Sequence, residues 1–156
     1  AANAVAAISR PNISDESFRS YLAKFEKGTQ GFINGDTRLW KENASKRDDV
    51  MIMGAWGAYE KGWPEVSKRY DWAGARFENS DAMLDVEYLM SQVSGDLAFT
   101  VAIERSRVKL AGMNATAPMQ LRVTHVHRRE NGEWKLILRH ADPLMNKTAP
   151  KDTLQQ

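Results

Sequence analysis

The amino-acid sequence predicts a single compact α+β domain whose last third is an antiparallel sheet. In the first half, apolar residues recur at the spacing of amphipathic helices. From Met83 onward the apolar period changes to two, which is typical of strands with one buried face. Between two such alternating runs stands Asn131-Gly132, a strong signal for a tight hairpin. The length of 156 residues suits one domain, and no repeat or long linker divides it.

The composition disfavours several classes of function. With 22 Lys and Arg against 20 Asp and Glu, the formal charge is only +2, so nucleic acid is not an expected partner. The chain has no cysteine, which excludes disulfides and thiolate chemistry. No stretch approaches the ~18 apolar residues of a membrane span, so we expect no membrane partner.

The two ends of the chain differ from the middle. We predict an Ala-rich lead at residues 1–13, loose or partly helical over residues 1–12, one domain at residues 14–143, and a polar tail at residues 144–156. The small residues at the start are compatible with an end left by a signal peptidase, and export after such cleavage stays open. We expect a cytoplasmic protein.

The first helix is expected to have Ser14 as its N-cap. Asp15 and Glu16 follow where the helix dipole favours negative charge. Ile13 and Phe18 have the spacing of a hydrophobic staple. The buried stripe of this helix is formed by Phe18, Tyr21, Leu22 and Phe25.

Two more helices and one short strand are expected before residue 80. Gly35-Asp36 ends the first helix and starts a short second one, which carries Leu39 and Trp40. Residues 50–56 are short and apolar and predict a strand. Pro64 fits the first turn of a third helix, where its missing N–H costs nothing. The buried stripe of the third helix is formed by Val66, Tyr70, Ala73 and Phe77.

Four longer strands are expected in the second half. Residues 83–93 and 97–104 form the first two, with Ser94-Gly95-Asp96 as the turn between them. Residues 120–129 and 134–140 form the last two. The Asn-Gly turn places Glu130 opposite Glu133, and by simple counting it places Thr124 opposite Arg139.

This register gives the final hairpin two different faces. One face is cationic and carries Arg122, Thr124, Val126, Ile137 and Arg139. The other face is largely apolar and carries three histidines; its members are Leu121, Val123, His125, His127, Trp134, Leu136, Leu138 and His140.

The hairpin resembles the C-terminal hairpin of SnoaL-like domains. The resemblance rests on residues 121–134 and on Arg139-His140-Ala141-Asp142. These domains belong to the nuclear transport factor 2-like superfamily, which includes ketosteroid isomerases. Residues 124–134 and His140 are also similar to the association domain of calcium/calmodulin-dependent protein kinase II. Upstream segments follow in the same order, namely Phe32-Ile33-Asn34-Gly35-Asp36, Asp48-Asp49-Val50 and Ser94-Gly95-Asp96-Leu97-Ala98, so the resemblance covers residues 14–143.

The resemblance implies a cone of three N-terminal helices packed on a strongly curved antiparallel sheet, with a pocket between them. It also implies a homodimer formed through the outer face of the sheet. In that arrangement the apolar hairpin face is outside and needs a partner. The side chains that would point into the pocket are Ile52, Gly54, Trp56, Phe99, Val101, Arg122, Thr124, Ile137 and Arg139. The opposite arrangement, with the apolar face against the helices and the arginines in solvent, stays open.

The resemblance does not carry ketosteroid isomerase chemistry to this chain. That reaction needs a carboxylate base beside acidic hydrogen-bond donors. At the positions where those enzymes place Tyr, Asp and a second Asp, an ungapped comparison puts Gly28, Gly54 and Thr124. The catalytic residues therefore stay unassigned.

Candidate ligand-binding residues come from both halves of the chain. Two guanidiniums and a hydroxyl, from Arg122, Arg139 and Thr124, would suit an anionic group. Trp40 and Trp56 are large flat side chains that would exclude water and shape a ligand. The full set of predicted ligand-binding residues is Trp40, Trp56, Tyr88, Val101, Arg122, Thr124 and Arg139. On strict alternation, Glu104 points away from this pocket.

No metal or cofactor is expected. His125-x-His127 has a spacing that can chelate zinc from a strand, but His127 and His140 lie far apart along the hairpin. The chain also has no nucleotide-binding loop. The sequence thus favours a domain that binds a small organic molecule, with an anionic one as an option, and acts as a cofactor-free isomerase, cyclase or hydrolase. The alternative is a non-catalytic association module, which a wide apolar outer face would favour.

Overall fold

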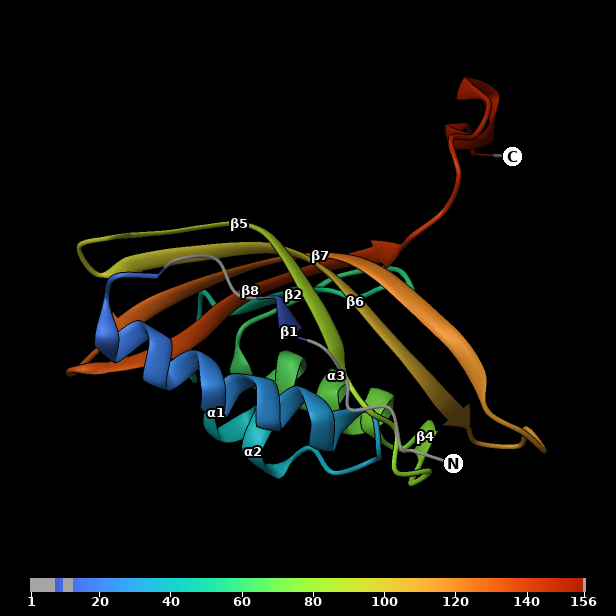
Figure 1. Ribbon diagram of the computed structural model, residues 1–156, viewed down its shortest axis with the longest axis horizontal. Coiled ribbons are helices and arrows are strands. Elements are labelled where there is room, and N and C mark those ends of the chain that lie inside the picture. The colour runs from blue at the N-terminus through green and yellow to red at the C-terminus, as the bar shows by residue number, and fades with distance from the viewer. Residues whose placement is uncertain (1–7, 10–12, 156) are drawn as a thin grey trace.

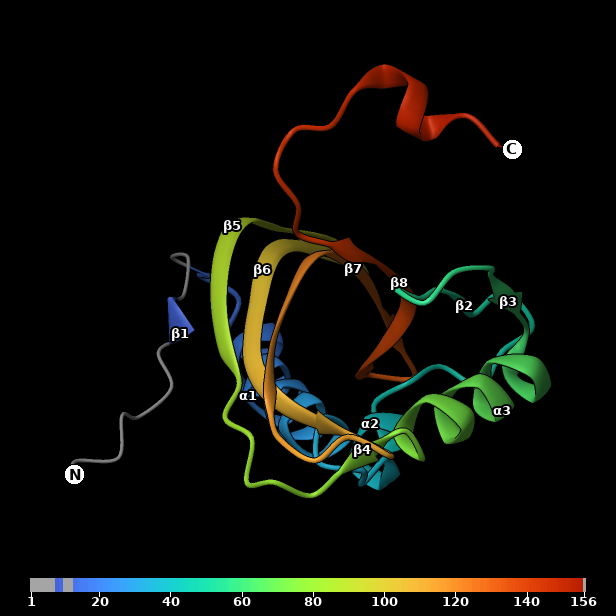
Figure 2. The same cartoon turned by 90° about the vertical axis from the view of Figure 1, so that its right-hand side faces the viewer.

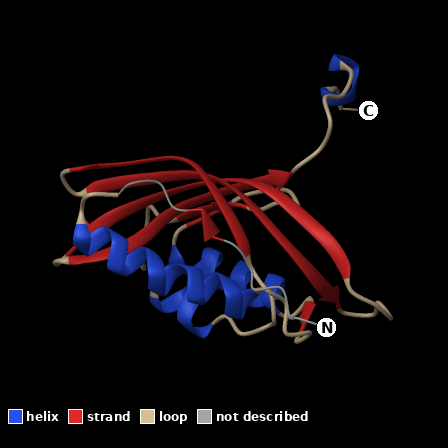
Figure 3. Ribbon diagram, in the orientation of Figure 1, coloured by secondary structure: helices blue, strands red, loops and turns tan. Residues whose placement is uncertain are grey.

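The computed structural model describes residues 8–9 and 13–155, and it confirms the predicted α+β architecture. Three α-helices lie on the concave side of a strongly curled sheet (Figures 1 and 3). They are α1 (Glu16–Phe32), α2 (Arg38–Glu42) and α3 (Trp63–Gly74). In Figure 2 the sheet curls over α1 and α2, and α3 closes the remaining side. The hydrophobic core fills the space between these two layers.

The helices begin where local chemistry satisfies their first N–H groups. The N-cap of α1 is Asp15 and not Ser14, because the Asp15 carboxylate accepts a hydrogen bond of 2.9 Å from the Phe18 backbone N–H. This bond is the main reason why the pKa of Asp15 lies below its ordinary value. The predicted start of α3 is confirmed, with Pro64 in its first turn. Phe77 does not extend the stripe of α3, since it lies in a following strand.

The sheet is mixed but mostly antiparallel. Its strand order is β1-β5-β6-β7-β8-β2-β3, and β4 pairs with β6. The strands are β1 (Ile8–Ser9), β2 (Met51–Met53), β3 (Glu60–Lys61), β4 (Phe77–Glu78), β5 (Asp85–Ser94), β6 (Leu97–Leu110), β7 (Ala117–Glu130) and β8 (Glu133–Pro143). Two pairings are parallel: β1 with β5, and β2 with β8.

The predicted lead at the N-terminus lies mostly outside the described residues. Of residues 1–12 the structure describes only Ile8–Ser9, which form β1, so this part of the lead is a strand and neither loose nor helical. At the other end, the chain leaves the domain after β8 and carries a short 3-10 helix, Pro150–Thr153, away from the sheet (Figure 1). Within the described residues, no helix has the length and apolarity needed to cross a membrane.

The turn of the final hairpin is as predicted, but its register is not. Asn131 and Gly132 both have positive φ, 52° and 82°, and Glu130 pairs with Glu133. Further along, Arg139 pairs with His125 and not with Thr124. The reason is a β-bulge in β8: Leu136 pairs with His127 and Leu138 with Val126, so Ile137 is the extra residue.

The two faces of the sheet are largely the reverse of the predicted ones. Leu121, Val123, His125, His127, Trp134 and Leu136 are buried, and several of them contact the helices, whereas Arg122 is exposed. The bulge brings Arg139 back to the inside and leaves Leu138 and His140 outside. The same holds on β6, where Ala98, Thr100, Ala102 and Glu104 are buried. We call the side of the sheet away from the helices the outer face; it carries Phe99, Val101, Ile103, Thr124, Val126 and Leu138.

Candidate functional site

A cavity of about 80 Å³ lies between the helices and the inner side of the sheet. That volume holds several water molecules or a small organic group. Its wall is mostly apolar and includes Trp40 from α2, Tyr70 from α3 and Ile52 from β2. The loop that follows β2 adds Gly54, Ala55 and Trp56. The charged side chains of the wall are Arg69, Glu104 and Arg139.

Glu104 and Arg139 form a buried ion pair on this wall. The Nη1 of Arg139 lies 3.1 Å and 3.0 Å from the two carboxylate oxygens of Glu104. The two side chains are only 9% and 13% exposed. Such a pair is rarely a strong source of stability, because removing two charges from water costs about as much as their attraction returns. A buried pair in a cavity wall therefore calls for a functional explanation.

His125 accepts a hydrogen bond from the same nitrogen of Arg139 that contacts Glu104. The Nη1 of Arg139 donates to the Nε2 of His125 over 2.9 Å, which requires a neutral imidazole with its proton on Nδ1. Burial, followed by the charge of Arg139, holds the pKa of His125 well below its ordinary value. Since the described hydrogen bonds of Arg139 all leave from Nη1, its Nε and Nη2 remain available for a ligand.

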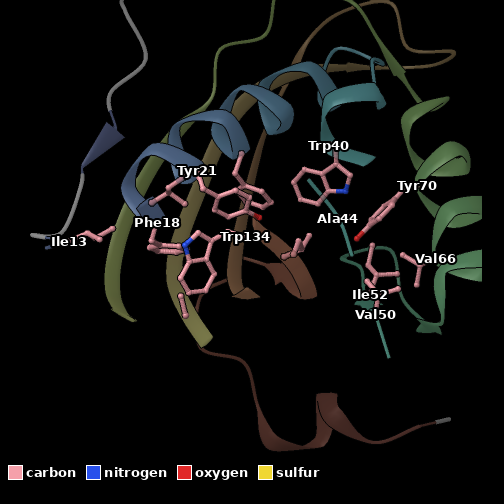
Figure 4. Packing of buried hydrophobic residues seen from close by; sticks show 14 residues of the cluster. Ile13, Phe18, Tyr21, Trp40, Ala44, Val50, Ile52, Val66, Tyr70 and Trp134 are labelled. Atoms are coloured by element: carbon pink, nitrogen blue, oxygen red, sulfur yellow. The ribbon is translucent and has the colours of Figure 1, made fainter. Parts of the chain in front are cut away.

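Two hydrogen-bond donors on the cavity wall have no partner. The indole Nε1 of Trp40 and the hydroxyl of Tyr70 are buried, and neither meets hydrogen-bond geometry with any described group. The two rings lie 5.7 Å apart, edge to face. Figure 4 shows the indole nitrogen on the side of the ring that faces Tyr70. Burial raises the pKa of Tyr70 to about 12 despite the opposing effect of the nearby Trp40 N–H, which lies close to the Tyr70 oxygen without meeting hydrogen-bond geometry, so the phenol keeps its proton and can donate it in a hydrogen bond.

Comparison with solved structures shows which fold surrounds this cavity. No protein-family model and no curated protein matches this chain. A proposed dehydratase from Streptomyces avermitilis is 20% identical with a TM-score of 0.66, and the match covers 84% of this chain and 96% of that one. A ketosteroid isomerase-like protein from Erwinia carotovora atroseptica is 16% identical with a TM-score of 0.69, covering 85% and 99%. The chain has the nuclear transport factor 2-like fold.

The fold also includes proteins of another kind. A proposed calcium/calmodulin-dependent protein kinase II association domain from Xanthomonas campestris is 12% identical with a TM-score of 0.66. The match covers 92% of this chain and 98% of that one. The predicted resemblance to both groups is thus confirmed at the level of the fold. Identities this low say nothing of the reaction, which has to be argued from the residues of the cavity.

Three of the seven predicted ligand-binding residues line the cavity of this nuclear transport factor 2-like fold. These three are Trp40, Trp56 and Arg139. Val101 and Thr124 point to the outer face and Arg122 is exposed, so their predicted orientation is wrong. Tyr88 is not part of the wall, and its hydroxyl donates to Glu26 over 2.9 Å.

Glu104 and Tyr70 line the cavity but are not in the predicted ligand-binding set. The prediction that Tyr70 belongs to the buried stripe of its helix is confirmed, and its hydroxyl has no hydrogen-bond partner among the described groups. The prediction that Glu104 lies on the side of its strand opposite Val101 is also confirmed, but that side is the inside. The signal that could have found it is the small size of Ala98, Thr100 and Ala102, because small residues allow helices to pack closely on a sheet.

The histidines do not form a metal site. His125 and His127 are buried on the inner side, whereas His140 lies outside. Among the described residues, no three histidine or acidic side chains come together in a way that could hold a metal ion. The roles of His125 and His127 are instead to accept or donate hydrogen bonds inside the core.

Proposed function

We propose that this chain binds a small organic molecule in the cavity and acts on it by acid–base chemistry, as a dehydratase or an isomerase does. The observation that carries the proposal is the carboxylate of Glu104 on a mostly apolar wall. Arg139 fixes its orientation, and His125 fixes Arg139. A carboxylate held in this way on a mostly apolar wall is a suitable general base.

The unpaired donors of Trp40 and Tyr70 suit the negative charge that such a reaction develops on the substrate. When Glu104 removes a proton from a carbon beside a carbonyl group, the electron pair moves to the carbonyl oxygen. The hydroxyl of Tyr70 and the N–H of Trp40 are donors that could stabilise the resulting charge, at no cost in broken hydrogen bonds. The proton can then return to another carbon, or a neighbouring hydroxyl can leave as water. The dehydratase-like and isomerase-like descriptions of two proteins with this fold agree with this class of chemistry.

A proton-exchange experiment tests this role of Glu104. Cyclohexanone dissolved in D2O with the protein should exchange its α-protons faster than in buffer alone, as seen by proton NMR. Glu104→Gln should reduce the catalysed rate by at least about a hundredfold, since the base is lost. The matched control is Glu87→Gln, which neutralises an acid that pairs with Arg105 on another part of the sheet. Equal rates for Glu104→Gln and the wild type would reject Glu104 as the base.

A second candidate function is association between copies of the chain. The outer face carries the half-buried apolar side chains of Phe99, Val101 and Ile103 on β6, beside Val126 and Leu138. An apolar surface of this kind favours a homodimer with the two outer faces in contact. The two functions are compatible, because the cavity opens on the other side of the sheet.

Light scattering on Val101→Glu tests the homodimer. The new charge would be buried without a partner in the interface, so the dimer should dissociate. The control Ser20→Glu adds the same charge to an exposed position of α1 and should leave the mass unchanged. A Val101→Glu protein with the same mass as the wild type would place the interface elsewhere or show that none exists.

A further inference from the structure

The mouth of the cavity is built from aromatic side chains. Trp56 lines the cavity and is 42% exposed, so it lies where the cavity meets solvent. Its ring is 5.9 Å from that of Trp72, which is 39% exposed, and 5.4 Å from that of Phe77. The two exposed indoles meet edge to face, at 76°, and form an apolar corner that leads from the cavity to the outside of α3.

Two guanidiniums stack on this surface. The Cζ of Arg76 lies 3.5 Å from the centre of the Trp72 ring, and the Cζ of Arg69 lies 4.3 Å from it. The spacing of these residues along α3 and its end brings all three side chains to one face of the helix. Stacking holds a guanidinium in a fixed plane, so less freedom is lost when it binds an anion.

The two arginines differ in their counter-charges. Arg69 lies 3.6 Å from the Glu60 carboxylate and donates to the Gly57 carbonyl over 2.8 Å, so it anchors the loop that carries Trp56. Arg76 donates one bond, from Nη1 to the Trp72 carbonyl over 2.6 Å. In the part of the chain that the structure describes, no carboxylate pairs with Arg76. Its remaining N–H groups form an unneutralised fork at the mouth.

The size of the cavity makes this fork relevant to a substrate. A volume of about 80 Å³ holds a ring or a short chain, whereas ligand sites commonly reach several hundred Å³. A larger substrate with its reacting carbon at Glu104 must therefore extend past Trp56. The charged groups near that path are Arg69 on the wall, which already pairs with Glu60, and the unneutralised guanidinium of Arg76 on Trp72.

We infer that the substrate is an organic anion, whose apolar body lies against Trp56 and whose carboxylate or phosphate binds Arg76, the guanidinium that Trp72 holds in place. This inference rests on the proposed function, because it takes the cavity as the binding site. It assigns a specificity role to Trp72 and Arg76. The anionic group is thus expected at the mouth on α3 and not at Arg122, which lies on the exposed side of the hairpin.

Calorimetric titration with two probes of the same shape tests the inference. Phenylacetate should bind the wild type about fivefold more tightly than phenylacetamide at low ionic strength, because only the acid carries a charge for Arg76. The ratio should fall toward one in Arg76→Gln, and in the wild type at high salt. The control Arg19→Gln removes an exposed arginine at the start of α1 and should keep the preference.

The outcomes separate this inference from the proposed function. Gly54→Leu adds a side chain to the cavity wall, at a position where the Cβ would meet nothing closer than 3.8 Å, so it should narrow the cavity and weaken the binding of both probes. Equal affinities of the two probes in the wild type, or a preference that survives Arg76→Gln, would overturn the inference alone. Phenylacetamide binding that Gly54→Leu leaves unchanged, or no binding of either probe, would overturn the cavity as the site and with it both proposals. A change in the unfolding free energy of Arg76→Gln with an intact preference would assign Arg76 a structural role only.

Discussion

Buried Tyr and Trp side chains occur on both sides of the core, but their polar atoms have hydrogen-bond partners on one side only. On one side, which we call the aromatic end, Tyr21 and Trp134 are buried beside His127. The Tyr21 hydroxyl lies 2.9 Å from the Nδ1 of His127, and the Trp134 indole donates to the Ser17 hydroxyl over 3.1 Å. The hydroxyl of Tyr21 and the indole N–H of Trp134 therefore each have a partner, whereas the Nε2 of His127 has none among the described groups.

The other side, which we call the cavity end, contains Trp40, Tyr70, Glu104 and Arg139. Trp40 and Tyr70 are buried as deeply as Tyr21 and Trp134, yet their donors have no partner. Figure 4 shows that the two pairs belong to one continuous core. Buried polar groups in folded proteins nearly always have a hydrogen-bond partner, and exceptions require an explanation. This difference between the two Tyr–Trp pairs favours a structural role for the aromatic end, and it supports the proposal that a polar ligand binds at the cavity end.

Acid should destabilise the protein, and the two histidines allow the effect to be divided between the ends. Burial lowers the pKa of His127 to about 3, from an ordinary 6.5. Below pH 6.5 the imidazole of His127 is therefore protonated in the unfolded chain but stays neutral in the folded protein. Stability is thus complete above pH 6.5 and is lost as the pH falls toward 3, by about 1.4 kcal/mol per pH unit. His125 acts in the same direction, because burial and the Arg139 charge lower its pKa too.

Urea unfolding at several pH values between about 7 and 5 measures this dependence, since the ordinary carboxylates have not yet titrated there. His127→Gln should reduce the slope by removing the contribution of the aromatic end. His125→Gln should reduce it by removing the contribution next to Arg139. A stability that does not change over this range would show that the histidines are not buried in neutral form.

Local signals were enough to predict most elements of the fold. The Asn131-Gly132 turn, the stripe of α1 and the start of α3 depend on neighbouring residues, and each was predicted correctly. The register beyond the turn was not, because the bulge at Ile137 leaves no local mark in the sequence. One extra residue was enough to separate Arg139 from Thr124 and Arg122 and to bring it to Glu104.

The candidate site was only partly predictable for a related reason. Alternation along a strand defines two faces but does not say which one is covered by helices. The size of Phe99 and Val101 favours them as the inner set, whereas the small Ala98 and Ala102 are inside. Trp40 and Trp56 were predicted from size alone. The pairing of Glu104 with Arg139 joins two strands that are 35 positions apart, and no local pattern reports it.

The sharpest test of the difference between the two ends is a pair of Tyr→Phe substitutions. Tyr21→Phe should cost about 1–3 kcal/mol of unfolding free energy, because it leaves a buried nitrogen of His127 without its partner. Tyr70→Phe keeps the shape of the core and removes a hydroxyl that has no partner, so it should be neutral or stabilise the fold by about 1 kcal/mol. Both free energies come from urea unfolding at neutral pH, where burial keeps both phenols protonated because it raises their pKa values. If Tyr70→Phe proved as costly as Tyr21→Phe, the Tyr70 hydroxyl would have a structural partner. The cavity end would then be an ordinary part of the core, and Tyr70 would no longer be a free donor for a substrate oxygen.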